Sequence, residues 1–349
     1  MGTPVALAGS IRSRGLRGFL GPLEPHLDAV EEDLRRQLDA FAPELRPMVR
    51  ATLEAGGKRL RPALALLAGE VTGGVDDRHV RLGTILEMVH TATLVHDDIL
   101  DHAELRRQGP TATSRWGPEL AVLLGDALFA HALQLAAAYP TPHVCAEIAR
   151  ATNTVCSGEI LQTLRRQDLS LAIPEYIRLI EMKTAALFEV SCRLGAFFNC
   201  GDAAATAALA RYGRDLGIAY QIYDDCLDIY GRESEAGKSL GTDVATGKLT
   251  LPVLLALDAG DRTDDCRELE ALLAAGPAAD ARRLRALLAR HQAFERGLEV
   301  LDRYLAGAAA HLAELPDGPA RRALAALPRT IGGRAARLRR GPDAPAEGV

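Results

Sequence analysis

The 349-residue sequence has few aromatic residues and no strong excess of either charge. Phe, Trp and Tyr make up 4% of the chain, and 41 Lys and Arg residues stand against 46 Asp and Glu residues, for a formal net charge of -5. Proteins that bind nucleic acids usually carry a basic excess on one face, so this balance argues against a nucleic-acid partner. Local clusters of charge are therefore more informative than the total.

The chain also lacks the cysteine spacing of zinc sites and of disulfide scaffolds. Its six cysteines are dispersed without a CxxC pair. We expect them to be small apolar core residues in a reducing compartment. The N-terminus has no apolar signal-peptide core, and no segment approaches 18 uncharged apolar residues, so we expect a cytoplasmic protein.

What is abundant is the composition of helices. Hydrophobic residues make up 48% of the chain, and the stretch 175–251 runs without a proline. This predicts a mostly helical fold with a sizeable core. Short breaks such as YPTPH indicate helix connections inside one domain rather than linkers. We therefore expect a single helical domain over residues 25–331.

Both ends of the chain are expected to be poorly ordered, over residues 1–24 and 332–349. The second of these segments, GGRAARLRRGPDAPAEGV, begins with a cluster of arginines. Arginines can touch an anionic membrane surface, so peripheral membrane contact is the most that this tail predicts. A solubilising end is the simpler interpretation.

Two acidic triplets share one spacing. VHDDILD contains Asp97, Asp98 and Asp101, and QIYDDCLD repeats the pattern. One DDxxD is usually only a solvated helix face, but with each acid near 6% of an average chain, on the order of 0.1 such triplets are expected by chance. Apolar helical patterns precede both triplets, and residues four apart share a helix face. The first and last acids of each triplet are therefore expected to point the same way.

Facing helices would bring these carboxylates together around a cavity. Such a cluster repels itself and stays partly protonated unless cations fill it. All-oxygen ligands favour Mg²⁺ or Mn²⁺ over zinc, and Mg²⁺ typically binds through a few carboxylates plus the phosphates of a substrate. The acidic triplets therefore predict a diphosphate bridged by metal.

Basic segments alternate with the acidic ones. GGKRLRP places Lys58 and Arg61 behind two glycines that let the backbone approach an anion. Other cations follow each acidic triplet or lie near it along the chain, namely Arg106, Arg107, Lys183, Lys238 and Lys248. This alternation predicts two anion sites, one with metal and one without.

The sequence resembles the trans-polyprenyl diphosphate synthases, the head-to-tail prenyltransferases, from residue 25 to about residue 330. The motifs GGKRLRP, LVHDDILDHAELRR, GEILQ, KTAALF, YQIYDDCLDIYG and GKSLGTDVATGKLTLP follow the order of that family. The resemblance implies an all-α, isoprenoid synthase-type bundle of long antiparallel helices around a deep central cavity, usually as a homodimer. It also implies an isopentenyl diphosphate substrate and an allylic co-substrate such as farnesyl, geranyl or dimethylallyl diphosphate.

The resemblance assigns a role to each matching position. It makes three acids the principal Mg²⁺ ligands, with three more in support: Asp97, Asp101 and Asp224, then Asp98, Asp225 and Asp228. It places four cations on or near the allylic diphosphate: Arg106, Lys183, Lys238 and Lys248. It places four residues on isopentenyl diphosphate: Lys58, Arg61, His90 and Arg107. Thr184, Gln221 and the Lys183 carbonyl would stabilise the allylic cation, while His96 has no implied role beyond structure.

One loop departs from the family pattern. Where the family commonly reads RRGxPTxN, this chain reads RRQGPTAT, with Gln108 in place of glycine and Thr113 in place of asparagine. The departure puts the conformation of this loop in question, but not the two arginines before it.

Product length in this family depends on what blocks the cavity below the first aspartates. Positions four and five before Asp97 hold Thr93 and Ala92, about one turn or ~5.4 Å deeper. These small residues predict that the cavity is not blocked at this depth. Phe129 or Leu133 is expected to form a second possible floor, which would stop chain growth further down. We expect a medium-to-long product, hexaprenyl to octaprenyl, with geranylgeranyl diphosphate as the alternative.

Two other classes of protein use similar acidic motifs. A non-catalytic subunit of a heteromeric synthase would be expected to lose acids or cations from the motifs, and this chain keeps them. A terpene cyclase or head-to-head synthase has no need of a metal-free diphosphate site, so GGKRLRP counts against it. Turnover that depends on isopentenyl diphosphate separates the three.

Overall fold

The computed structural model describes residues 21–106, 109–199, 202–231, 240–258, 264–278 and 280–338. Several sequence predictions fall outside these ranges and stay predictions, namely those for Arg107, Gln108, Cys200, Lys238 and the terminal segments 1–20 and 339–349.

The described residues form helices joined by short connections. The α-helices are α2 (Glu24–Arg36), α3 (Arg46–Leu53), α4 (Leu60–Thr72), α5 (Asp77–Leu100), α6 (Ala112–Trp116), α7 (Pro118–Ala137), α8 (Pro142–Leu164), α9 (Ile173–Ile180), α10 (Ala186–Phe197), α11 (Ala203–Tyr230), α13 (Thr242–Ala245), α14 (Leu251–Asp258), α15 (Asp264–Ala274), α16 (Ala281–Arg290), α17 (Ala293–His311) and α18 (Pro319–Leu338). Shorter helical turns are η1 (Gly21–Leu23), η2 (Gln37–Ala40), η3 (Glu181–Ala185), η4 (Gly276–Ala278) and η5 (Leu312–Glu314). The strands β1 (Leu105–Arg106) and β2 (Gly109–Pro110) form an antiparallel pair, with Leu105 opposite Pro110.

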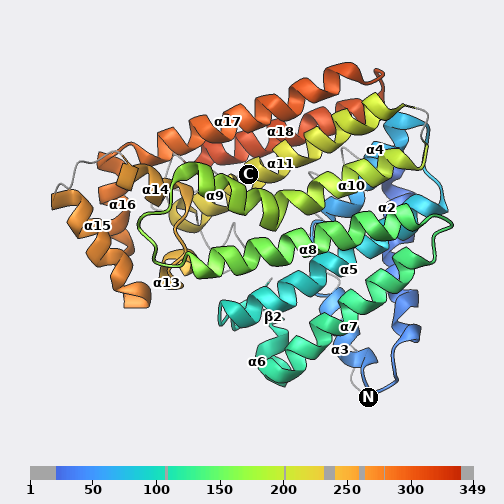
Figure 1. Ribbon diagram of the computed structural model, residues 1–349, viewed down its shortest axis with the longest axis horizontal. Coiled ribbons are helices and arrows are strands. Elements are labelled where there is room, and N and C mark those ends of the chain that lie inside the picture. Colours follow the sequence, from blue (N-terminus) through green and yellow to red (C-terminus); the bar gives the residue numbers. More distant parts are fainter. Residues whose placement is uncertain are drawn as a thin grey trace, which may run out of the picture.

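The long helices lie side by side in a bundle (Figure 1). Helix α10 packs against α4 and α11, α5 packs against α7 and α4, and α17 lies along α11. The helices α15 and α16 form one end of the molecule. This arrangement confirms the predicted all-α fold.

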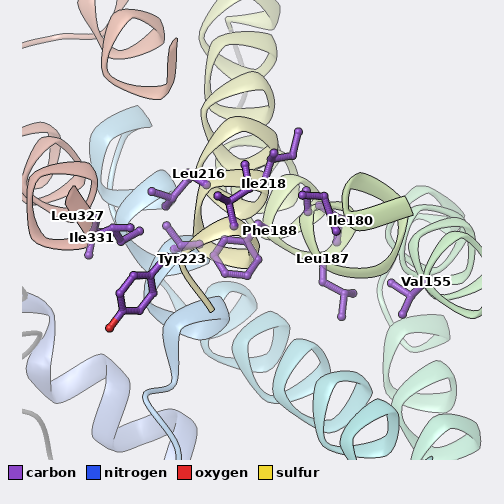
Figure 2. Close-up of a cluster of buried hydrophobic side chains, with 14 of the residues drawn as sticks. Val155, Ile180, Leu187, Phe188, Leu216, Ile218, Tyr223, Leu327 and Ile331 are labelled. Carbon is purple, nitrogen blue, oxygen red and sulfur yellow. The ribbon is translucent and has the colours of Figure 1, made fainter. Parts of the chain in front are cut away.

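The core joins helices that are far apart in the sequence. Figure 2 shows one part of it, with Leu187 and Phe188 of α10, Leu216 of α11 and Leu327 of α18 among the buried side chains. These side chains are nearly inaccessible to water, and burial of one such side chain contributes roughly 1.5–3 kcal/mol. The packing of α10 against α11 holds in place two of the helices whose residues line the cavity described below.

The predicted boundaries of the ordered region were too narrow. Residues 21–24 form η1 and the start of α2, and residues 332–338 continue α18. The arginines of this last segment suggested an unstructured tail, but α18 continues through it, and Ala335 and Leu338 are buried. The prediction of a poorly ordered tail was therefore wrong for residues 332–338.

Helix α7 is long and unusually apolar. Among the described helices, it has the length and composition of a membrane span, with a mean hydropathy of 1.7 over an 18-residue window. It packs in the bundle against α5, α6 and α8, but only 39% of that window is buried. Leu120, Val122 and Leu123 are exposed on it. The helix therefore leaves an apolar face uncovered in the single chain.

The cysteines within the described ranges differ in burial. Cys192, Cys226 and Cys266 are buried, which agrees with a core role. Cys156 differs, because it is exposed and lines the cavity described below.

Candidate active site

A cavity of about 1510 Å³ opens between α2, α4, α5, α8, α10 and α11. Asp97, Asp101 and Asp224 line one part of it, so acids from both triplets face the same space. Lys58 and Arg61 line it as well. Acidic and basic motifs up to 166 positions apart in the sequence therefore line one cavity, and the carboxylates of the two triplets were predicted to meet around such a cavity.

The first triplet lies at the C-terminal end of α5. A cap at Asp76 starts the helix, and Asp101 ends it. Carboxylates are unfavourable at this end because the helix dipole is negative there. The position excludes the simple explanation that these acids complement the start of a helix. It leaves them dependent on nearby cations.

Asp98 faces the protein and not the cavity. It is buried, and its carboxylate accepts a hydrogen bond of 2.6 Å from Nε of Arg106. Burial raises the pKa of Asp98 to about 6, although Arg106 acts in the opposite direction. Asp98 therefore orients Arg106, which itself lines the cavity, and the structure does not bring Asp98 to the predicted metal position.

Asp101 is held between two cations. Its carboxylate lies 2.7 Å from Nζ of Lys248 and 3.1 Å from Nη2 of Arg166. Lys248 was predicted near the second triplet, and the structure places it on the first. Arg166 was missed, because an arginine at the end of a helix is ordinary. Together they compensate the acid where metal was predicted.

Asp97 and Lys183 each influence the pKa of the other. Burial raises the pKa of Asp97, while Lys183 and Lys248 oppose that rise. Burial would lower the pKa of Lys183, but Asp97 and Glu159 outweigh it, so that pKa lies above its ordinary value. Lys183 therefore stays charged inside the site.

The GEILQ motif supplies partners for Lys183. Glu159 forms an ion pair with its ammonium group, and Oε1 of Gln162 accepts a hydrogen bond of 3.0 Å from it. The sequence had indicated no role for either residue of this motif. Their spacing of three puts both on the face of α8 that points to Lys183.

Lys183 and Thr184 lie on the π-helical turn η3, which interrupts the run from α9 to α10. Such turns are rare and occur often at functional sites. Gly158 of α8 lets this turn come close, since a Cβ there would lie 2.8 Å from the backbone nitrogen of Lys183. The glycine of GEILQ is therefore required by backbone proximity.

The second triplet divides in the same way as the first. Asp224 lines the cavity, whereas Asp225 is deeply buried and accepts hydrogen bonds from Tyr176 (2.5 Å) and Gln221 (2.7 Å). Burial and the neighbouring Asp243 raise the pKa of Asp225 to about 8, and these two donors oppose the rise. The predicted pair of Thr184 and Gln221 is brought together, at 2.7 Å.

Asp228 does not line the cavity, contrary to its expected position on the same face as Asp224. Its carboxylate accepts hydrogen bonds from Oγ1 of Thr242 at 3.3 Å and from the backbone nitrogen of Asp243 at 3.2 Å. It therefore fixes the segment that starts α13. Asp243 itself lines the cavity and was missed, although GKSLGTDVATGK had been singled out for its lysines.

The residues predicted to bind isopentenyl diphosphate lie together on the cavity wall. Nζ of Lys58 is 3.4 Å from Oη of Tyr220, and the guanidinium of Arg61 lies 5.0 Å from the centre of the Phe188 ring. His90, on α5, lines the same cavity. Cations over aromatic rings are held in place while their charge remains available to an anion.

The predicted chain-length residues separate into two groups. Thr93 lines the cavity, whereas Ala92 is fully buried. Phe129 and Leu133 are packed against the core and are not among the lining residues, because they belong to α7 on the far side of α5. The proposed second floor at these two positions therefore does not belong to this cavity.

Other residues form the apolar walls. Leu94, Val155, Ile160 and Leu187 line the cavity, and Figure 2 shows Val155 and Leu187 beside each other. His96, predicted to be structural, bonds to the backbone carbonyl of Val122 at 3.1 Å while lining the edge of the cavity.

The acids suit a metal that arrives with phosphate. Among the residues that the structure describes, no three Asp, Glu, His or Cys side chains are grouped closely enough to hold an ion by themselves. Mg²⁺ needs no such cage, because it binds through a few carboxylates together with substrate phosphates. Asp97, Asp101 and Asp224 face one space and fit that mode.

Comparisons with known proteins agree with this site. The polyprenyl synthetase family model matches residues 42–289. Heptaprenyl diphosphate synthase component 2 of Geobacillus stearothermophilus is 36% identical over 309 residues, which cover 88% of this chain and 95% of that protein. Nonaprenyl diphosphate synthase of Mycobacterium tuberculosis is 39% identical over 273 residues, covering 77% and 80%.

A solved structure shares the fold. The polyprenyl synthase from Caulobacter crescentus CB15, complexed with calcium and isoprenyl diphosphate, superimposes with a TM-score of 0.85 at 33% identity, covering 91% of this chain and 97% of that one. The chain belongs to the polyprenyl synthetase family, and it is a prenyltransferase.

Proposed function

We propose that the protein is an all-trans polyprenyl diphosphate synthase that extends an allylic diphosphate with isopentenyl diphosphate, to a hexaprenyl to octaprenyl product. The observation that carries this proposal is one cavity lined by Asp97, Asp101 and Asp224 on one side and by Lys58 and Arg61 on another. Two diphosphates can bind there at once, one with metal and one without.

The acidic side would bind the allylic diphosphate. Asp97, Asp101 and Asp224 would hold Mg²⁺, or Mn²⁺ in its place, which supplies positive charge to the departing diphosphate. Lys183 and Arg106 line the same space and add fixed positive charge there. These groups stabilise the leaving group as the bond to the allylic carbon breaks.

The remaining steps use the rest of the wall. Thr184 and Gln221 present oxygens to the allylic cation, and the apolar side chains of α5, α8 and α10 keep water away from it. Lys58, Arg61 and His90 hold isopentenyl diphosphate so that its double bond attacks the cation. The proton that is then lost passes to the released diphosphate.

Product length follows from the wall near Thr93. Its side chain lines the cavity, and its hydroxyl donates a hydrogen bond of 2.7 Å to the His90 carbonyl. The small side chain leaves room for a growing chain. The heptaprenyl and nonaprenyl relatives support a long product over geranylgeranyl diphosphate.

The test is a chromatographic product analysis with Mg²⁺, farnesyl diphosphate and labelled isopentenyl diphosphate. We expect a ladder that ends at one long product, and we expect Thr93→Phe to shorten it. Thr93→Val keeps the size of the side chain and should leave the ladder unchanged. A wild-type protein that makes no product longer than geranylgeranyl diphosphate would contradict the proposed length.

We propose further that two copies of the chain pair through α7, because its exposed leucines leave an apolar face uncovered. Leu123→Glu, at a side chain 62% exposed, should shift the protein from dimer to monomer in sedimentation. The outward charge costs little in the monomer and much in an apolar interface. Leu169→Glu, on an exposed leucine outside α7, is the control and should leave the dimer intact.

A second candidate is a synthase that needs a different partner chain. One relative is named a component of heptaprenyl diphosphate synthase, which favours this alternative. Incorporation by the purified chain alone would exclude an obligate partner. If the folded protein incorporates no isopentenyl diphosphate, the result would favour the hypothesis of a synthase subunit over that of an enzyme that acts by itself.

A further inference from the structure

Arg59 stands between the two cations of GGKRLRP, but it points into the protein. Lys58 is exposed, whereas Arg59 is 8% exposed. Its guanidinium donates to both oxygens of Glu31 (2.7 and 3.2 Å), to Glu87 (2.6 Å) and to the backbone carbonyl of Leu53 (2.9 Å). All of these donors are directed at protein acceptors, although Arg59 and its partners also line the cavity.

The backbone of Arg59 is also unusual. It precedes α4 in the left-handed conformation, with φ 47° and ψ 38°. This conformation is unfavourable for a residue with a side chain. The four hydrogen bonds of the guanidinium hold the turn in this conformation and offset its cost. The turn therefore depends on the contacts of Arg59.

The contacts of Arg59 reach every element that carries the metal-free site. Glu87 lies on α5 three residues before His90, so the two share a helix face. Lys58 and Arg61 flank Arg59 in the loop and at the start of α4. Glu31 belongs to α2, and Leu53 ends α3. One buried side chain thus connects the loop to α2, α3 and α5.

The charge of this cluster remains fixed. Burial alone would lower the pKa of Arg59, but Glu87 and Glu31 outweigh burial and leave the pKa above its ordinary value. Breaking a buried ion pair by removing one partner is strongly destabilising, because it leaves an uncompensated charge. Breaking the contacts of Arg59 with Glu31 and Glu87 is therefore costly.

We propose that Arg59 is a positioning residue for the metal-free diphosphate site, holding Lys58, Arg61 and His90 in one rigid frame. The inference rests on the proposed function, which assigns isopentenyl diphosphate to these three groups. The groups of the allylic site are carried by other contacts, such as those of Asp101 with Lys248 and Arg166. Loosening the frame should therefore affect one substrate and spare the other.

The test compares two substrates in variants of the cluster. Arg59→Lys removes the forked geometry, and Glu87→Gln keeps shape and one acceptor while it removes the charge. A displacement near 1 Å can cost about 10²-fold, so we expect the KM for isopentenyl diphosphate to rise about 10- to 100-fold. The KM for farnesyl diphosphate should stay within about twofold, which separates positioning from general damage.

The control variant removes a different ion pair between α2 and α5. Arg81 of α5 pairs with Asp33 of α2 at 3.2 Å, outside the GGKRLRP loop. Arg81→Met should leave both KM values unchanged. Far-UV circular dichroism would show which variants fold, and Glu87→Gln carries the test if Arg59→Lys does not fold.

Binding of inorganic pyrophosphate without metal, measured by calorimetry, makes the result independent of turnover. We expect Glu87→Gln to weaken it and Arg81→Met not to. A folded Glu87→Gln that binds pyrophosphate like the wild type, or that raises both KM values equally, would overturn the inference. Wild-type protein that binds pyrophosphate but incorporates no isopentenyl unit would instead overturn the proposed function and leave this assignment standing.

Discussion

Removal of the Tyr176 hydroxyl should change both the stability of the protein and its turnover. It donates a hydrogen bond of 2.5 Å to Asp225, and both residues are buried. The other oxygen of Asp225 accepts from Gln221, which pairs with Thr184. The chain from Tyr176 to Thr184 therefore links a buried tyrosine on α9 to oxygens proposed to face the allylic cation.

The size of the effect follows from the ionisation of Asp225. A hydrogen bond to a charged group contributes about 1.5–3 kcal/mol and one between neutral groups about 0.5–1.5 kcal/mol. Since the pKa of Asp225 is raised to about 8, Tyr176→Phe should cost the smaller amount at pH 6 and the larger at pH 9. Gln221 should also shift slightly, because the carboxylate that accepts its hydrogen bond is no longer held by Tyr176. Such a small displacement should lower kcat about 10- to 100-fold.

The sign of the pH dependence can be worked out from linkage. A raised pKa means that the native state binds the proton more tightly than the unfolded chain, so this contribution to stability is lost as pH rises through about 8. Loss of the tyrosine donor raises the pKa further. The variant should therefore fall further behind the wild type, in free energy of unfolding by urea, as pH rises above about 8.

Tyr212→Phe is the matched control. Tyr212 lies on α11 and is also fully buried, but its hydroxyl donates to the Leu324 carbonyl at 2.8 Å, away from the acids. This variant should lose about 0.5–1.5 kcal/mol at any pH and keep its kcat. The reasoning fails if the two variants have the same kcat, or if the deficit of Tyr176→Phe does not change between pH 6 and pH 9.

Two other predictions concern the cap of α5 and the metal. Burial would raise the pKa of Asp76, but hydrogen bonds from Arg78 and His79 outweigh burial and lower that pKa to about 2. Asp76→Ala should therefore lower the free energy of unfolding by urea by about 1 kcal/mol at pH 6. This deficit should shrink as pH falls from about 4 towards 2, because a carboxylate with a lowered pKa stabilises the native state only while it is ionised. A deficit that stays constant to pH 3 would contradict this. Chelating divalent metal should stop incorporation but leave the thermal midpoint unchanged, because Lys248 and Arg166 already compensate Asp101; a midpoint that falls on chelation would show that metal binds tightly without substrate.

Much of the fold and site could be predicted because the signals were local. The helical pattern located α5 and α11, and the spacing of four correctly predicted that Asp97 and Asp101 point the same way. The rotation of about 100° between adjacent residues likewise separated Asp98 from Asp97. Periodicity determines such positions within one element.

The rest depended on contacts between distant segments. Asp228 is drawn from the cavity by the segment that starts α13, and the partners of Arg59 lie 28 residues away on either side. In the sequence, Arg59 is indistinguishable from its neighbouring cations. The position of Phe129 behind α5 likewise follows from how α7 packs, which no spacing in the sequence reveals.

The ion pairs of Asp101 have a consequence for the order of events. A metal ion held by this carboxylate would compete with Lys248 and Arg166 for its two oxygens, so binding would exchange one counterion for another. Cations released in this way would become available to a phosphate group, which would make the exchange more favourable. Metal and diphosphate would then raise each other's affinity by the same factor, and neither alone is expected to saturate the site.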